Sequence, residues 1–249
     1  MEIRYMKHYS SHLNRNMEFK VYGHRGKPVL FIPCQSGRFY DFENFHMSDV
    51  WAKWIEPGQV TVYAADCIDD ETYACPGGDP RSRIEQHERW YHYMVDELVP
   101  TIRHLSGERN WQDIPIMTFG CSLGAMHAAN LFFRRPDLFD SVLALSGLYD
   151  PGQYFGGYID DLVYQNSPCL YLPNMPWDHP YIHMYNQRNM VFCVGQGAWE
   201  DEPLASTAWL QQILREKGIY AQVDFWGHDV NHDWYWWYRQ VEHYVPRFL

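Results

Sequence analysis

Short, uninterrupted apolar runs alternate with helical patterns along most of this chain, and that alternation limits the folds open to it. Such a run is typical of a strand in a parallel sheet, because the connecting helices cover both faces of the sheet. The pattern therefore predicts an α/β protein with a mostly parallel central sheet and helices on both faces. The predicted strands are PVLFIP at 28–33, VTVYAAD at 60–66, PIMTFGC at 115–121, SVLALSG at 141–147, MVFCVG at 190–195 and YAQVDFWG at 220–227.

Two further strands open the chain, EIRYMKHYS and MEFKVYGH, and predict an antiparallel N-terminal edge to the sheet. Residues 151–188 are rich in Pro, Tyr, Asn and Gly and predict an irregular excursion over the sheet. The chain has no repeat, low-complexity tract or Ser/Gly linker, so residues 1–249 are expected to form a single domain. Helices are predicted at about 49–58, 80–105, 122–134 and 202–218.

The net charge and the cysteine content limit the classes of binding partner and the cellular compartment that we expect for this chain. A formal net charge of −11 argues against nucleic acid and anionic membranes as partners. No segment approaches a membrane span, and the N-terminal residues lack the apolar core of a signal peptide. The six cysteines are scattered, and only Cys67 and Cys75 could meet in a loop, so a reducing cytoplasm is the expected location.

A Gly-x-Ser-x-Gly motif, GCSLG, lies between a predicted strand and a predicted helix. A sharp strand-to-helix turn would hold Ser122 in a strained conformation, which requires neighbours without side chains two positions away. Gly120 and Gly124 meet that requirement. The N-terminus of the helix favours an oxyanion, so we predict that Ser122 is a nucleophile. The alternative is a serine that caps a helix packed closely through its glycines.

The residues around this motif carry a family resemblance. GCSLGAMHAANLFFRRPDLFDSVLALSG closely resembles the putative-esterase (esterase D–like) branch of the α/β-hydrolases, and YMVDELVPTIRHL resembles the helix that precedes the motif in that family. The resemblance runs from PVLFIP onward and is weakest across 151–188. It implies the α/β-hydrolase fold and a serine esterase that cleaves carboxylic esters or thioesters through an acyl-enzyme, without a metal or cofactor.

Two histidines follow the last predicted strand, where this fold places its catalytic base. In the related esterases that histidine is followed by an aromatic residue two positions on and by a tryptophan five positions on. His232 has Trp234 and Trp237 at these offsets, which implies that His232 is the general base. His228 is then a loop histidine bonded to Asp229 or to the backbone, or part of a lid.

The spacing of His228 and His232 is also compatible with a metal site, since residues four positions apart share one face of a helix. Gly227 and Asn231 disfavour a continuous helix there, and no third ligand is spaced to complete such a site. We therefore predict that this chain has no metal site.

The orienting acid should follow the strand at 190–195, where three acidic residues stand together. The commonest family pattern, Gly-x-x-acid, fits QGAWE and implies Glu200, whereas a mycolyltransferase-like variant implies Asp201. Asp201 could instead cap the next helix, with Glu202 as a solvated residue of its first turn. We favour Glu200 as the acid and keep Asp201 as the alternative.

Two backbone N–H groups are expected to form the oxyanion hole. One belongs to Leu123, which follows the nucleophile, and the other to Gln35 or Ser36 in the loop CQSGRFYDFENF. Relatives carry His-Gly or Asp-Gly in that loop, so this chain departs from the family pattern at the second donor. Cys34 in the same loop is expected to be a packing residue.

Aromatic residues make up 17% of the chain, and some of them could wall an acyl or sugar groove, while others pack the flanks of the sheet. Three functions stay open from the sequence: a serine hydrolase of small-molecule esters, an acyltransferase with the same triad, and a non-catalytic binding module. The sequence also leaves open whether the chain forms a homo-oligomer. The candidate groove residues are Phe39, Tyr40, Phe42, Phe45 and the Trp234–Trp237 cluster.

Overall fold

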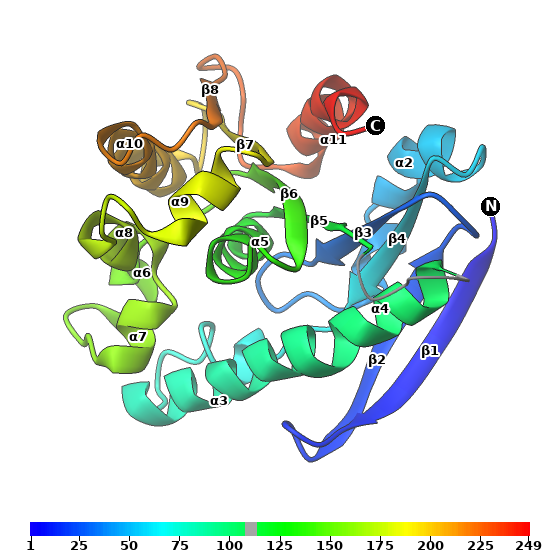
Figure 1. Cartoon of the computed structure of the whole chain (residues 1–249), viewed down its shortest axis with the longest axis horizontal. Coiled ribbons are helices and arrows are strands. Elements are labelled where there is room, and N and C mark those ends of the chain that lie inside the picture. The colour runs from blue at the N-terminus through cyan, green and yellow to red at the C-terminus, as the bar shows by residue number, and fades with distance from the viewer. Residues whose placement is uncertain (108–113) are drawn as a thin grey trace.

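The computed structural model describes residues 1–107 and 114–249 (Figure 1). Within them, eight strands form one sheet in the order β1-β2-β4-β3-β5-β6-β7-β8. Strands β3 to β8 pair in parallel, whereas β1 pairs antiparallel with β2, and β2 with β4. The predicted mostly parallel sheet with an antiparallel N-terminal edge is confirmed. The strands are β1 Ile3–Ser10, β2 Arg15–Tyr22, β3 Lys27–Ile32, β4 Val60–Ala65, β5 Ile116–Cys121, β6 Phe139–Leu145, β7 Asn189–Val194 and β8 Gln222–Phe225.

Helices cover both faces of this sheet, as the apolar strands require (Figure 1). Strands β4 and β5 are buried at every residue, whereas β1 alternates between exposed and half-buried residues, as an edge strand does. On one face lie α2 (Met47–Ile55) and α11 (Trp234–Tyr244), around a core that includes Trp51, Phe119 and Trp237. On the other face lie α3 (Pro80–His92), α4 (Val99–Ser106), α5 (Leu123–Arg134) and α10 (Asp201–Glu216).

The helix predicted over 80–105 is one helical stretch with a wider turn inside it. Asp79 caps its start by accepting a hydrogen bond from the backbone N–H of Ser82, and Pro80 occupies the first turn. A π-helical segment, η2 (Tyr93–Leu98), then joins α3 to α4. The sequence analysis did not foresee this π-turn, which differs from an α-turn by a single extra residue.

Residues 151–188 hold short helices separated by loops. Several of these helices begin at signals in the sequence, such as the Asp160 cap before Val163 and the prolines Pro168 and Pro180. The segment packs against α5 and α10, and Tyr185 donates a hydrogen bond to the carbonyl of Phe133 on α5. The helices are α6 Gly152–Phe155, α7 Asp161–Gln165, α8 Pro168–Tyr171, η4 Leu172–Asn174 and α9 Pro180–Tyr185.

All six cysteines carry free thiols, so Cys67 and Cys75 are not bonded to each other. Among the described residues, none of the helices combines the length and the apolar composition of a membrane span.

Candidate active site

Ser122 lies in a sharp turn between β5 and α5. Its φ of 57° and ψ of −129° are strained for a residue with a side chain. A Cβ on Gly120 would lie 2.3 Å from the carbonyl of Gly124, and a Cβ on Gly124 would lie 2.3 Å from the carbonyl oxygen of Ile32. Only glycines allow the helix to approach the sheet this closely. The turn projects the Ser122 hydroxyl beyond the carboxyl end of the strands, as the motif predicts.

The Ser122 hydroxyl does not cap its helix, although the residue occupies the N-cap position. Its Oγ lies 2.9 Å from His232 Nε2, and His232 Nδ1 lies 3.2 Å from Glu200 Oε2. An ionised carboxylate can only accept hydrogen bonds, so Nδ1 carries the proton and Nε2 offers a lone pair to the serine hydroxyl. The structure thus brings together the three residues that the sequence selected from separate segments.

The Glu200 side chain is 1% exposed, and its second oxygen is also hydrogen-bonded. Oε1 accepts a bond of 2.6 Å from the Ser146 hydroxyl and one of 3.3 Å from the backbone N–H of Gly195. Ser146, in turn, accepts a bond of 3.1 Å from the indole N–H of Trp237. Sequence reasoning missed Ser146 as a site residue, although it belongs to the Ser-Gly that ends the strand SVLALSG.

Asp201 and Glu202 lie on the solvent side of the same turn, and both are exposed. Helix α10 begins at Asp201, and Glu200 occupies the N-cap position without making a side-chain cap bond. The N-cap role considered for Asp201 is therefore wrong, because the residue already belongs to the first helical turn. Its carboxylate still lies at the helix N-terminus, where a negative charge is favoured.

The loop that carries His232 is bonded to the loop that carries Glu200. The backbone N–H of His232 donates to the carbonyl of Ala198 at 2.9 Å, and the Asn231 side chain accepts from the N–H of Ala198 at 2.8 Å. The ring of Trp237 meets the His232 ring edge-on, with centroids 5.0 Å apart. These contacts fix the distance between acid and imidazole.

His228 lies in the same loop but is exposed. Within the described part of the chain it makes no hydrogen bond, so the expected bond to Asp229 or to the backbone is wrong. Both nitrogens of His232 already contact Ser122 and Glu200. In residues 1–107 and 114–249, no group of three or more His, Cys, Asp or Glu side chains is arranged to hold a metal ion.

The two candidate second donors of the oxyanion hole differ in their contacts. The backbone N–H of Ser36, a residue with a φ of 57°, donates to Asp69 Oδ2 at 3.2 Å. For Gln35 and for Leu123, at the start of α5, the backbone N–H groups have no acceptor among the described residues. Leu123 has none because the first N–H groups of a helix lack an acceptor in the preceding turn.

Two cysteines lie near Ser122, and neither is suited to be a nucleophile. Cys121 precedes Ser122 and is fully buried, which raises the pKa of its thiol well above the ordinary range. Burial also raises the pKa of the Cys34 thiol, and the negative charges of Asp41 and Asp69 add to the effect. Because the thiolate is the reactive form of cysteine, the high pKa values leave both side chains inert near neutral pH.

A comparison with known protein families identifies the family of the chain. The model of the family described as "Putative esterase" matches residues 10–248. The chain belongs to the putative esterase family. It is accordingly a carboxylic ester hydrolase, the enzyme class that the resemblance of the GCSLG region implied. A search of curated proteins found no match.

The solved structures that are similar to this esterase include several hydrolases. A ferulic acid esterase matches with a TM-score of 0.75 at 17% identity, covering 99% of this chain and 96% of the other. The S-formylglutathione hydrolase of Agrobacterium tumefaciens matches with a TM-score of 0.70 at 15% identity and coverages of 99% and 93%. The fluorophosphonate-binding serine hydrolase F of Staphylococcus aureus gives 0.68 at 11% identity, with coverages of 99% and 97%. These likenesses establish the predicted α/β-hydrolase fold.

The aromatic residues considered as groove walls of the esterase divide into two groups. Phe39 and Phe42 are 7% and 0% exposed and belong to the interior. Phe45 is exposed and stacks on Trp234, with ring centroids 4.7 Å apart. Tyr40 and Tyr235 are exposed as well, whereas Trp237 is 4% exposed and belongs to the interior. Trp199, which was not among the candidates, precedes Glu200, is 83% exposed and has a positive φ of 66°. The exposed rings, and not the interior ones, present aromatic surface to a ligand.

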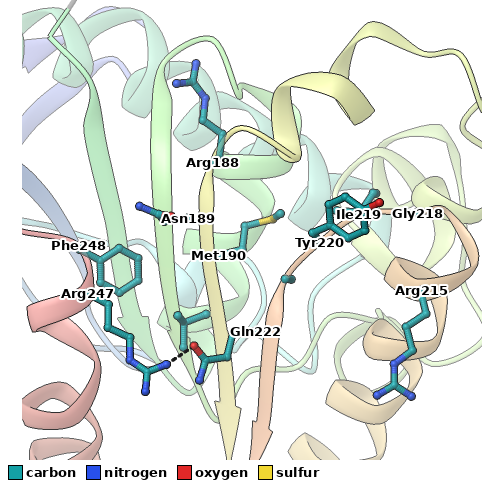
Figure 2. Close-up of a pocket in the computed structure, with 12 residues that line it drawn as sticks. Arg188, Asn189, Met190, Arg215, Gly218, Ile219, Tyr220, Gln222, Arg247 and Phe248 are labelled. Carbon is teal, nitrogen blue, oxygen red and sulfur yellow. Dashed lines mark hydrogen bonds between the residues drawn. The ribbon is translucent and has the colours of Figure 1, made fainter.

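A cavity of about 720 Å³ in the esterase lies away from Ser122. It is lined by residues at the amino ends of β7 and β8, such as Asn189 and Gln222, whereas Ser122 follows the carboxyl end of β5. Figure 2 shows that the guanidinium groups of its three arginines do not converge. Arg247 bonds to Gln222, which leaves the cavity without a focused anion site. The arginines are Arg188, Arg215 and Arg247.

Proposed function

We propose that Ser122, His232 and Glu200 form the catalytic triad of this esterase and that the reaction passes through an acyl-enzyme. The observation that carries the proposal is the continuous pair of contacts from the Ser122 hydroxyl through His232 to Glu200, at 2.9 Å and 3.2 Å. This is the arrangement in which a base activates a serine and a carboxylate orients the base.

In the acylation step, Ser122 Oγ attacks the carbonyl carbon of the ester while His232 Nε2 takes the hydroxyl proton. The carbonyl π-electrons move to the oxygen, which forms a tetrahedral oxyanion. When the oxyanion collapses, the bond to the leaving alcohol breaks, and His232 gives its proton to that alcohol. Glu200 stabilises the imidazolium during this step without taking its proton.

In the deacylation step, a water molecule repeats the attack on the acyl group held by Ser122. His232 Nε2 takes a proton from the water, and the second tetrahedral oxyanion collapses to release the carboxylic acid. The proton returns to Ser122 Oγ, which restores the starting state. Water and alcohol thus occupy the same position relative to His232 in the two halves of the reaction.

We further propose that the oxyanion is bound by the backbone N–H groups of Leu123 and Gln35. Ser36 is the less suitable second donor, because its N–H is already bonded to Asp69. An N–H without a protein acceptor can be directed at an oxygen that carries charge only during the reaction.

The substrate that we propose is a small-molecule carboxylic ester or thioester. The matching structures support both classes, since they include ferulic acid esterases and S-formylglutathione hydrolases. Exposed aromatic rings beside the site, Phe45 and Trp199 among them, suit an aromatic or sugar-bearing substrate.

The decisive experiment replaces the proposed nucleophile. Ser122→Ala should abolish the turnover of p-nitrophenyl acetate and prevent labelling by a fluorophosphonate probe, because both depend on Ser122 Oγ. The circular dichroism spectrum should not change, because alanine retains the backbone contacts of the turn. A folded variant with normal turnover would refute the triad.

A further inference from the structure

Asp69 is a buried carboxylate that the proposed reaction does not use. It is the first residue of the 3₁₀ turn η1 (Asp69–Glu71) beyond β4, and it is 3% exposed. Oδ2 accepts a hydrogen bond of 3.2 Å from the backbone N–H of Ser36, and Oδ1 lies 3.0 Å from His127 Nε2. Because a carboxylate accepts hydrogen bonds, the imidazole of His127 is the donor in the second contact.

These two partners stand beside the two proposed oxyanion donors. Ser36 directly follows Gln35 in the loop after β3. His127 lies about one turn beyond Leu123 on α5, and it is 1% exposed. A single carboxylate therefore connects the loop that holds one donor to the helix that holds the other.

We propose that Asp69 is a positioning residue that sets the distance between the backbone N–H groups of Gln35 and Leu123. The proposal rests on the triad and oxyanion hole proposed above. Asp69 does not touch the substrate. It acts through Ser36 on one side and through His127 on the other.

The loop around Ser36 needs such a contact because its backbone is strained and borders a polar cavity. Ser36 has a φ of 57°, a conformation that persists in a residue with a side chain only when the surroundings hold it. A polar cavity of about 250 Å³ adjoins Ser36 and Gly37. The loop is held there by hydrogen bonds, including one of 2.8 Å from the Cys67 thiol to the carbonyl of Gly37.

The other end of the connection is rigid. The His127 ring stacks on His87 with centroids 5.1 Å apart and meets Tyr73 edge-on at 5.2 Å. Its Nδ1 is buried and has no hydrogen-bond partner among the described residues. The bond to Asp69 is thus the ring's only hydrogen bond in that part of the chain, and the packing prevents the ring from following a displaced loop.

This arrangement predicts a distinct kinetic effect. The negative charge on the substrate oxygen exists only in the tetrahedral states, so a displaced N–H weakens transition-state binding and leaves substrate binding nearly unchanged. Loss of Asp69 should therefore lower kcat with little change in KM. A merely structural role would instead lower the fraction of folded enzyme and leave the kcat of the folded molecules unchanged.

The test compares Asp69→Ala with the unsubstituted enzyme, using p-nitrophenyl acetate as substrate and 1,1,1-trifluoroacetone as an inhibitor that forms a tetrahedral hemiketal with Ser122. We expect kcat to fall by about 10²-fold, as for the loss or misplacement of one oxyanion donor. The Ki of the ketone should rise by about the same factor as kcat/KM falls, because the hemiketal carries the same oxyanion. A folded Asp69→Ala variant with normal kcat, or with lowered kcat and an unchanged Ki, would overturn the proposal.

A matched control separates catalysis from stability. Glu88 accepts two hydrogen bonds from Arg134, at 2.9 and 2.6 Å, in a largely buried pair that does not contact the Ser36 loop. Glu88→Ala should lower the melting temperature while leaving kcat and the Ki of the ketone unchanged. Equal effects of Glu88→Ala and Asp69→Ala on kcat would contradict a specific role for Asp69.

A second pair of variants covers the case in which Asp69→Ala does not fold. His127→Gln retains an N–H that can donate to Asp69, whereas His127→Phe retains ring packing without a donor. We expect near-normal kcat in the first and a lowered kcat with a raised Ki in the second. Equal kinetics in the two would refute the proposal. The Ser122→Ala experiment tests the triad without involving Asp69, so a failure of the triad proposal can be told apart from a failure of this one.

Discussion

Ser146 donates a hydrogen bond of 2.6 Å to Glu200 Oε1, the oxygen opposite the one that contacts His232. A buried carboxylate is costly unless its oxygens are hydrogen-bonded, and the hydroxyl of Ser146 and the N–H of Gly195 meet that need. Ser146 is itself fully buried and has a φ of 55°. The backbone is thus strained at a residue whose side chain supports the proposed acid of the triad.

Ser146→Ala should lower both kcat and stability. It removes a donor to Glu200 and an acceptor for the indole N–H of Trp237. Leaving such buried groups unsatisfied costs about 1–3 kcal/mol each, so urea denaturation should show a lower free energy of unfolding. With p-nitrophenyl acetate, kcat should fall while KM changes little, because the carboxylate then holds the imidazole less firmly. A variant with normal kcat would show that His232 and Gly195 suffice to hold Glu200.

The acid can be assigned by comparing Glu200→Gln with Asp201→Asn. The amide at 200 cannot hold the imidazole in the tautomer that accepts the serine proton, so kcat should fall by up to about 10⁴-fold. Asp201 is exposed in the first turn of α10, so its amide should cost only about 0.3–1 kcal/mol of stability and leave kcat nearly intact. The opposite pattern of kcat values would transfer the role to Asp201.

The two histidines give a matched pair of variants in one loop. His232→Ala should be as damaging as Ser122→Ala, and the double variant should be little worse, because triad members act as a unit. His228→Ala should retain kcat, because this exposed residue makes no hydrogen bond within the described residues. Labelling of Ser122 by a fluorophosphonate should slow sharply in the first variant only. An inactive His228→Ala beside an active His232→Ala would show that the tryptophan offsets are misleading.

Gly124→Ala should destabilise the turn around Ser122. Its Cβ would lie 2.3 Å from the carbonyl oxygen of Ile32, so α5 must move away from β3, at a cost of about 1–3 kcal/mol. The same movement shifts Leu123, so kcat should fall as well. Gly77→Ala is the control, because a Cβ there meets no atom within 4 Å. Its free energy of unfolding and kcat should stay close to the original values, and an equal loss in both variants would contradict the packing argument.

Alkylation by iodoacetamide at pH 8 should leave the esterase active. Burial raises the pKa of the Cys34 thiol, so the reactive thiolate is scarcer at this pH than in an ordinary cysteine. The same applies to the buried Cys121 next to Ser122. Residual turnover of p-nitrophenyl acetate after alkylation measures the effect. Rapid inactivation, together with a modified Cys34 in the peptide map, would show a reactive thiol in the loop.

Local patterns in the sequence predicted most of the sheet. Each of the six parallel strands lies within about two residues of its predicted range. For the inner strands the reason is that a run that packs on both faces must be largely apolar, whereas the edge strand β8 is only half-buried. The turn at Ser122 was predictable for a related reason. In a strand–turn–helix unit the helix packs closely on the sheet, and a side chain at Gly120 or Gly124 would clash with the neighbouring backbone.

The exact ends of helices and the contacts of loops were harder to predict from the sequence. The N-cap of α10 falls at Glu200 and not at Asp201, a shift of one residue that no propensity resolves. Within the described residues His228 lacks the hydrogen bond expected for it, whereas Asn231 in the same loop bonds to the backbone of Ala198. The resemblance to the esterases could rank the histidines only by their aromatic neighbours.

The sequence by itself determined the order of strands and helices and the position of the serine turn, because both follow from residues that are close along the chain. Only the tertiary structure decided which carboxylate reaches His232 and what supports it. The contacts from His232 to Glu200, from Ser146 to Glu200 and from Ser36 to Asp69 join residues 32, 54 and 33 positions apart. Such pairs meet only when the whole sheet has formed, since each lies on loops that the parallel strands bring to one edge.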